Sequence, residues 1–118
     1  MPLLAGSSID VLDTQELLGR CLGKQELAQR VLARFRNQLS EDLTQLERAL
    51  LDGDATLIAR VAHRIKGAAA NVSARCLHEQ AAALECAART DAWGDIPGAI
   101  DQLASECDEF FAVWEQLL

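Results

Sequence analysis

A chain of 118 residues and 12.8 kDa is the size of one domain, and half of its residues are hydrophobic, enough to form a single core. No apolar run approaches the roughly 18 residues of a membrane-spanning helix, and the first residues lack the regions of a secretion signal. The net charge of −7 argues against nucleic acid and anionic membranes as partners. We therefore expect one soluble, cytoplasmic domain over residues 1–118.

The four cysteines are widely spaced and form no C-x-x-C pair. This spacing is typical of small apolar side chains in a reducing compartment rather than of disulfides. A metal or redox site built from Cys76, His78, Cys86 and Cys107 is the alternative. The sequence also lacks the Glu-x-x-His pairs of carboxylate metal sites in helical bundles. We therefore expect neither a metal nor a cofactor bound by this chain.

Helical periodicity begins near the N-terminus. A short helix is predicted after Asp13, where Asp-Thr-Gln-Glu can form a capping box, and it ends within 19–23. A long helix follows over about 24–51. Its apolar residues recur at steps of four or three: Leu27, Val31, Phe35, Leu39, Leu43, Leu46 and Leu50. Gly53 suits the left-handed position that ends this helix, and Asp54 suits the cap of the next.

Three further helices follow, over about 55–70, about 74–89 and from about 96 onward, with Pro97 in the first turn of the last. The middle helix is expected to face inward with Leu77, Ala81, Leu84 and Ala88. The last helix carries an apolar stripe of Ile96, Ile100, Leu103, Cys107, Phe110, Trp114 and Leu117. Short connections make consecutive helices antiparallel neighbours. The expected fold is all-α: an antiparallel four-helix bundle preceded by a short N-terminal helix.

The helix over 55–70 has an unusual outer face. At about 100° per residue its core face consists of Ile58, Val61, Ala62, Ile65, Ala69 and Val72. His63 lies opposite, and its neighbours on the outer face are Thr56, Ala59, Arg60, Lys66, Gly67 and Ala70. Most of these are small, and glycine inside a helix costs about 1 kcal/mol relative to alanine. Small side chains around an exposed imidazole indicate a place where another macromolecule approaches.

The residue types on this face suit a phosphoryl acceptor. A neutral imidazole, as in His63, can act as a nucleophile. Lys66 lies one helical turn away, where its ammonium can offset arriving negative charge. Gly67 removes a side chain that would otherwise cover the ring, although a glycine can also mark a close contact between helices. His78, the other histidine, lacks such neighbours and is expected at the surface or the core boundary.

The stretch A-H-R-I-K-G-A-A-A-N-V at 62–72, followed by Leu77 and the Leu84-Glu85 pair, resembles the histidine-containing phosphotransfer (HPt) domain. The resemblance extends over about 10–117 and includes Phe35, the Gly53-Asp54 turn and Ala87-Ala88-Arg89. It implies that His63 is phosphorylated at its outer nitrogen, Nε2. It also implies that Lys66 assists at the phosphoryl group and that Gly67 gives access. Ala59, Arg60, Gly67 and Ala70 are the expected docking residues.

One residue departs from the family pattern. HPt domains usually have glycine ten residues after the histidine, where this chain has Ser73. Because serine can serve as an N-cap of the following helix, we expect the fold to be kept with a slightly different turn, and a changed docking surface at that turn.

The resemblance further implies a phosphorelay. His63 would accept a phosphoryl group from an aspartate of a response-regulator receiver domain and pass it to another receiver, upstream of which stands a hybrid histidine kinase. The receiver is expected to bring Mg²⁺, and the chain shows no nucleotide-binding motif, so it is expected to be a carrier without kinase activity. We expect a free-standing monomer. The alternative is a non-catalytic helical module that binds a receiver or a kinase.

Overall fold

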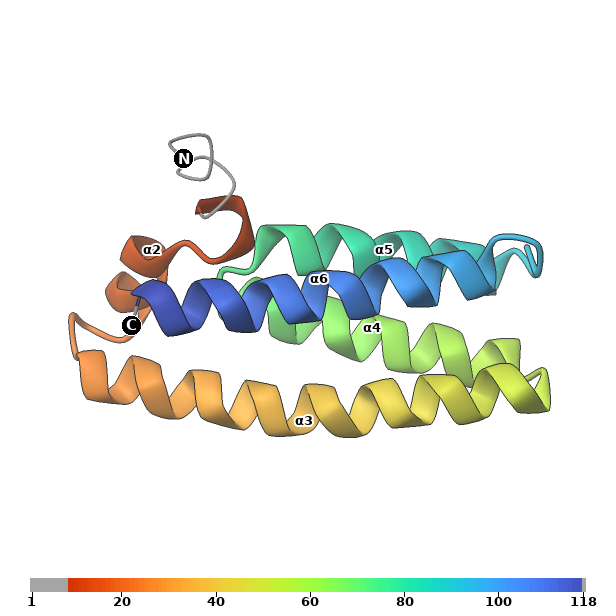
Figure 1. The fold of residues 1–118 in the computed structure, drawn as a ribbon, viewed down its shortest axis with the longest axis horizontal. Helices are drawn as coiled ribbons and strands as arrows, with labels where there is room; N and C mark the ends of the chain where they lie inside the picture. The colour runs from red at the N-terminus through yellow and green to blue at the C-terminus, as the bar shows by residue number, and fades with distance from the viewer. Residues whose placement is uncertain (1–8, 118) are drawn as a thin grey trace.

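The structure, a computed structural model, describes residues 9–117, with the side chains of 9–116. Its helices are α2 (Thr14–Arg20), α3 (Gln25–Asp52), α4 (Ala55–Asn71), α5 (Arg75–Arg89) and α6 (Ile96–Leu117). Figure 1 shows α3 to α6 running antiparallel along the long axis, with α2 at one end. The predicted all-α bundle with a short preceding helix is confirmed. Residues 1–8 and 118 of the predicted domain lie outside the described part.

The predicted helix ends agree with the structure because local side chains define them. The carboxylate of Asp13 accepts a hydrogen bond from the backbone N–H of Glu16 (3.0 Å), which starts α2. Gly53 ends α3 in the left-handed conformation with φ of 66°. The carboxylate of Asp54 then accepts from the N–H of Leu57 (3.0 Å) and starts α4. Each cap satisfies a backbone group that the helix itself leaves without a partner.

The predicted core stripes of α4, α5 and α6 are all buried, apart from Leu117, whose side chain lies outside the described part. The stripe predicted for α3 is partly wrong. Leu27 is exposed, and the residues that are buried recur at alternating steps: Ala28, Leu32, Phe35, Leu39, Asp42, Leu46 and Ala49. A step of four residues turns the helix by about 400°, so repeated steps of four drift around it by about 40° each. Alternating steps of four and three stay on one side.

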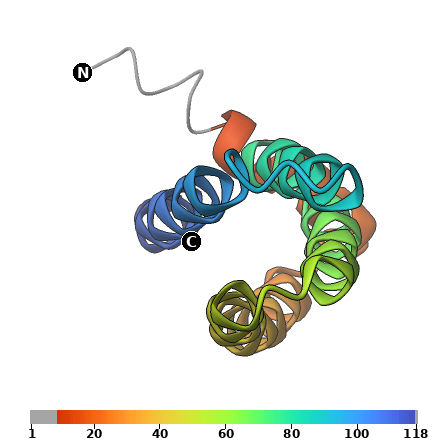
Figure 2. The same ribbon diagram turned by 90° about the vertical axis from the view of Figure 1, so that its right-hand side faces the viewer.

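Seen end-on, α3, α4, α5 and α6 form an arc in that order (Figure 2). Consequently α4 has a neighbour on each side, α3 and α5. The side toward α3 is joined by the Arg64 guanidinium, whose Nη2 lies 2.6 Å from Oδ1 of the buried Asp42 on α3. The side toward α5 carries the polar cluster described below.

Ser73 does not cap α5, although a serine could do so, and the fold is kept. The N-cap is Ala74, which provides no side-chain hydrogen bond, and Ser73 lies one residue earlier with φ of 62°. Its carbonyl accepts from the N–H of Asp13 (3.0 Å), which links this turn to α2. Its buried hydroxyl has no hydrogen-bond partner among residues 9–117. The left-handed conformation explains why glycine suits this position.

Ser73→Gly is expected to raise the free energy of unfolding by at least about 1 kcal/mol. A non-glycine residue with positive φ costs roughly 1–2 kcal/mol, and a buried hydroxyl without a partner costs about 1–3 kcal/mol. The greater freedom of glycine in the unfolded chain offsets about 0.5–1 kcal/mol of this gain. Urea denaturation of both proteins measures the difference. A variant less stable than the wild type would contradict this account of the turn.

Candidate functional site

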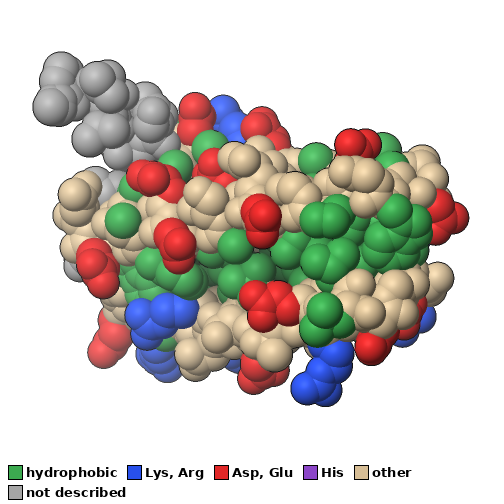
Figure 3. Space-filling model, turned by 45° about the vertical axis from the view of Figure 1, so that its right-hand side comes forward, with side chains coloured by type: hydrophobic (Ala, Val, Ile, Leu, Met, Phe, Trp, Pro, Cys, Tyr) green, Lys and Arg blue, Asp and Glu red, His purple; other side chains and the backbone are tan. Residues whose placement is uncertain are grey.

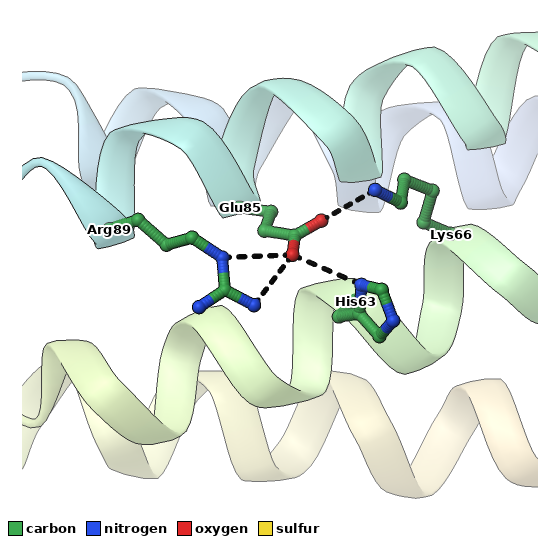
Figure 4. Close-up of polar contacts among 4 residues, drawn as sticks. All are labelled: His63, Lys66, Glu85 and Arg89. Atoms are coloured by element: carbon green, nitrogen blue, oxygen red, sulfur yellow. Dashed lines mark hydrogen bonds and ion pairs between the residues drawn. The ribbon is translucent and has the colours of Figure 1, made fainter.

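His63 projects from α4 at the edge that faces α5. Its side chain is 64% exposed, and its Nδ1 lies 3.0 Å from Oε2 of Glu85 on α5 (Figure 4). Among the side chains of residues 9–116, the one contact given to the ring is this bond at Nδ1. The helical register explains the exposure, because His63 lies on the opposite side of α4 from the buried Ile65 and Ala69.

Glu85 is the centre of a polar cluster in which three other side chains meet. Its Oε1 lies 2.8 Å from Nζ of Lys66, and its Oε2 accepts from Nε (3.0 Å) and Nη2 (2.7 Å) of Arg89. Figure 4 shows the side chains of His63 and Lys66 approaching this carboxylate from α4, and that of Arg89 from α5. Glu85 itself is buried, whereas all three partners are partly or largely exposed. A single buried carboxylate thus connects His63 and Lys66.

The sequence assigned no role to Glu85 or Arg89. Both occur there only as parts of the family resemblance, and their spacing of four residues is typical of an ion pair along one helix. What could have revealed Glu85 is its position: at about 100° per residue it lies next to the inward-facing Leu84 and Ala81, where an unpaired carboxylate would be costly. Which cations satisfy it depends on how α4 and α5 are aligned.

The cluster determines which nitrogen of His63 carries hydrogen. Hydrogen bonding to Lys66 above all, then to Arg89 and His63, lowers the pKa of Glu85 from 4.5 to about 2, although burial opposes this shift. At neutral pH the carboxylate is therefore ionised and can only accept hydrogen bonds. Nδ1 of a neutral His63 must then be the donor, and the lone pair lies on Nε2. The outward nitrogen is the one with nucleophilic character.

The lowered pKa of Glu85 predicts a specific dependence of stability on pH. A carboxyl whose pKa falls on folding stabilises the protein above its unfolded value, and that contribution is lost as pH falls from about 4.5 towards 2. We expect a contribution of about 2 kcal/mol, since exposed partners screen part of the interaction. Denaturant titrations of wild type and Glu85→Gln should differ by this amount at pH 6 and converge towards pH 2. A difference independent of pH would contradict this assignment.

The predicted docking residues occupy different environments. Arg60, Gly67 and Ala70 are exposed, as expected. A Cβ atom built on Gly67 would have no other part of the described chain within 4 Å, so no close helix contact accounts for this glycine. Ala59, however, is only 4% exposed, so its expected position on the exposed face is wrong, while its role in docking stays a prediction. Because α5 packs on this side of α4, the buried sector of α4 is wider than its apolar stripe.

Two hollows lie along α4, one on each side of His63 in the sequence. Ala59 lines one of about 400 Å³ together with Ala88 and Arg89 of α5. Ala70 lines the other, of about 220 Å³, near α2. Ala59 and Ala70 are eleven positions apart, which corresponds to about 16 Å along the helix. Along α4, the two hollows therefore lie to either side of His63.

His78 also lines the hollow near α2 and is half-buried, which agrees with its predicted boundary position. The four cysteines are free. Within residues 9–117, no three His, Cys, Asp or Glu side chains are grouped so that they could hold a metal ion, so Cys76, His78, Cys86 and Cys107 do not form a cluster. Burial raises the pKa of the Cys107 thiol to about 12. None of the described helices is long and apolar enough to cross a membrane.

Comparison with known proteins identifies the family. The model of the Hpt domain matches residues 30–113, which include His63, Lys66 and Glu85. The crystal structure of histidine-containing phosphotransfer protein B (HptB) from Pseudomonas aeruginosa PAO1 is 27% identical and superposes with a TM-score of 0.83, over 90% of this chain and 92% of that one. No curated protein matches significantly. The chain belongs to the Hpt domain family, and its function is histidine phosphotransfer in phosphorelays.

Proposed function

We propose that His63 is the residue that carries the phosphoryl group, accepting it from the aspartyl phosphate of one receiver domain and passing it to the aspartate of another. The observation that carries this proposal is the orientation of the ring. Nδ1 is hydrogen-bonded to the ionised, buried Glu85. The side chain is 64% exposed, and the lone pair of Nε2 points outward. Receiver domains and kinases are the partners of Hpt domains as a class.

The proposed phosphoryl transfer requires no movement of a proton. The lone pair on Nε2 of His63 forms the N–P bond as the P–O bond to the receiver's aspartate breaks, and the electron pair leaves with that carboxylate. The ring retains its hydrogen on Nδ1 and becomes positively charged. Glu85, 3.0 Å from Nδ1, compensates that charge. Onward transfer reverses these steps and restores the neutral ring.

The oxygens of Glu85 are already engaged, which supports a Mg²⁺ site on the receiver rather than on this chain. Glu85 is the buried carboxylate beside His63, and three cationic or hydrogen-bonding side chains already occupy its oxygens. Phosphoryl transfer needs positive charge at the phosphoryl oxygens. We therefore assign Mg²⁺ to the receiver, as its cofactor. The chain acts as a carrier, without kinase activity of its own, and as a monomer.

Lys66 is the residue we assign to charge stabilisation at the phosphoryl group. Its ammonium is held 2.8 Å from Glu85, one helical turn from His63, and its side chain remains 30% exposed. Lys66→Ala is expected to slow phosphoryl transfer to His63 by about 10- to 100-fold without eliminating it, since one charge-assisted hydrogen bond is worth about 1.5–3 kcal/mol. Rapid-quench measurements at saturating receiver test this. A rate equal to that of the wild type would remove Lys66 from the reaction.

The proposed function is tested by mixing the purified protein with a phosphorylated receiver domain and Mg²⁺. Phosphate should appear on the protein in a form that acid hydrolyses and alkali does not, as expected of a phosphoramidate. A protein that binds receivers in a titration but accepts no phosphate from any of them would instead be the non-catalytic binding module. ATP alone should label nothing; labelling by ATP would contradict the carrier assignment.

A further inference from the structure

The helices α3 and α6 form the two ends of the arc, and the packing between them changes along their length. At one end, aromatic side chains fill the space between them: the rings of Phe35 and Phe110 lie 5.3 Å apart, and Trp114 donates to Oε1 of Gln29 (2.9 Å). At the other end the facing side chains are smaller. A groove of about 390 Å³ remains there, lined by Leu43, Glu47, Leu50, Leu51, Ile100, Asp101 and Ala104. We call this the α3–α6 groove.

The floor and walls of the α3–α6 groove are mainly apolar. Leu43 and Leu50 belong to the stripe that drifts out of the core of α3, and Leu51 beside them is 87% exposed. Figure 3 shows hydrophobic side chains gathered along this face. A leucine at that exposure contributes little to the core, and a continuous apolar surface around it is typical of an interaction site.

Charge indicates what covers the α3–α6 groove. Glu47 and Asp101 lie in its lining. Along its whole length α6 carries five acidic side chains and no lysine or arginine, and of these five Asp101 lines the groove. A second copy of the same chain, with its net charge of −7, would place like charges together across this surface.

We infer that the α3–α6 groove binds an amphipathic helix of a partner protein, with apolar side chains in the groove and lysine or arginine beside Glu47 and Asp101. Amphipathic helices place apolar side chains at i, i+3, i+4 and i+7 into hydrophobic grooves of this kind. The groove lies between α3 and α6, whereas the His63 cluster lies on α4 and α5 (Figure 2), and no histidine is visible on the face in Figure 3. The partner can therefore hold the protein while His63 remains free for transfer. This inference does not depend on the proposed function.

A labelled synthetic helix tests the inference directly. The probe carries leucine at i, i+3, i+4 and i+7 and lysine elsewhere, and a control peptide has serine in place of each leucine. Fluorescence anisotropy should show at least tenfold tighter binding of the leucine peptide to the wild-type protein. Leu51→Lys should weaken that binding about tenfold, because it removes apolar contact and adds a like charge. Leu22→Lys is the matched control, as Leu22 is 81% exposed and lies outside the groove.

Two results would overturn the inference. One is equal affinity for the leucine and serine peptides, which indicates charge attraction alone. The other is binding that Leu51→Lys and Leu22→Lys reduce equally. Sedimentation velocity tests the other possible occupant, a second copy of the chain. A wild-type dimer that Leu51→Lys converts to monomer would show that a second copy covers the groove. Phosphate acceptance by Leu51→Lys should match that of wild type, so a failure here leaves the assignment of His63 intact.

Discussion

His63→Gln is expected to abolish phosphate acceptance from a phosphorylated receiver domain. Glutamine has no nucleophilic ring nitrogen, so no bond to phosphorus can form at this position. The fold should be unaffected, because the His63 side chain is 64% exposed and its loss removes one contact with Glu85. We expect the free energy of unfolding to change by less than about 1 kcal/mol. Transfer is measured with radiolabelled receiver, and stability by urea denaturation.

The matched control is His78→Gln. His78 is the other histidine of the chain, on α5, half-buried and away from the Glu85 cluster. This variant should accept phosphate at the wild-type rate. Label that persists in His63→Gln and disappears in His78→Gln would place the phosphorylated residue on α5 and overturn the assignment. Loss of label in both variants, with both folded, would also contradict it.

Gly67→Gln is expected to slow transfer at low receiver concentration by tenfold or more, while making the protein more stable. Glutamine is a better helix former than glycine by up to about 1 kcal/mol, and a Cβ at Gly67 meets nothing else within 4 Å in the described chain. The new side chain must therefore project outward, beside His63. There it occupies space that a docked receiver needs, and the concentration of receiver that gives half the maximal rate should rise.

The control for this substitution is Gly98→Gln. Gly98 is also an exposed glycine within a helix, α6, and a Cβ there likewise meets nothing within 4 Å. It does not belong to the α4–α5 face, so transfer should be unchanged. The steric explanation fails in two cases: if Gly67→Gln transfers phosphate like wild type, or if both substitutions slow transfer to the same degree.

Much of the bundle could be predicted because its signals are local. Asp13 and Asp54 form caps with residues three positions ahead, and Gly53 supplies a left-handed turn within one segment. The arrangement of His63, Lys66 and Gly67 on one helix follows from a repeat of about 100° per residue. The spacing of apolar residues was insufficient to predict the buried face of α3, because the predicted stripe drifts around that helix. Packing buries Ala28 and Ala49 there, in place of their larger neighbours Leu27 and Leu50.

The sequence alone therefore determined the helices, their order and the placement of the proposed nucleophile, His63, with its two neighbours on one helix, because each depends on residues within one or two turns. Tertiary structure decided the rest. Glu85 meets His63 and Lys66 only because α5 packs alongside α4, and that same packing buries Ala59. Ser73 has positive φ because its turn must join α4 to α5 while its carbonyl meets α2. Contacts between residues distant in the chain depend on how helices are aligned, which no local periodicity specifies.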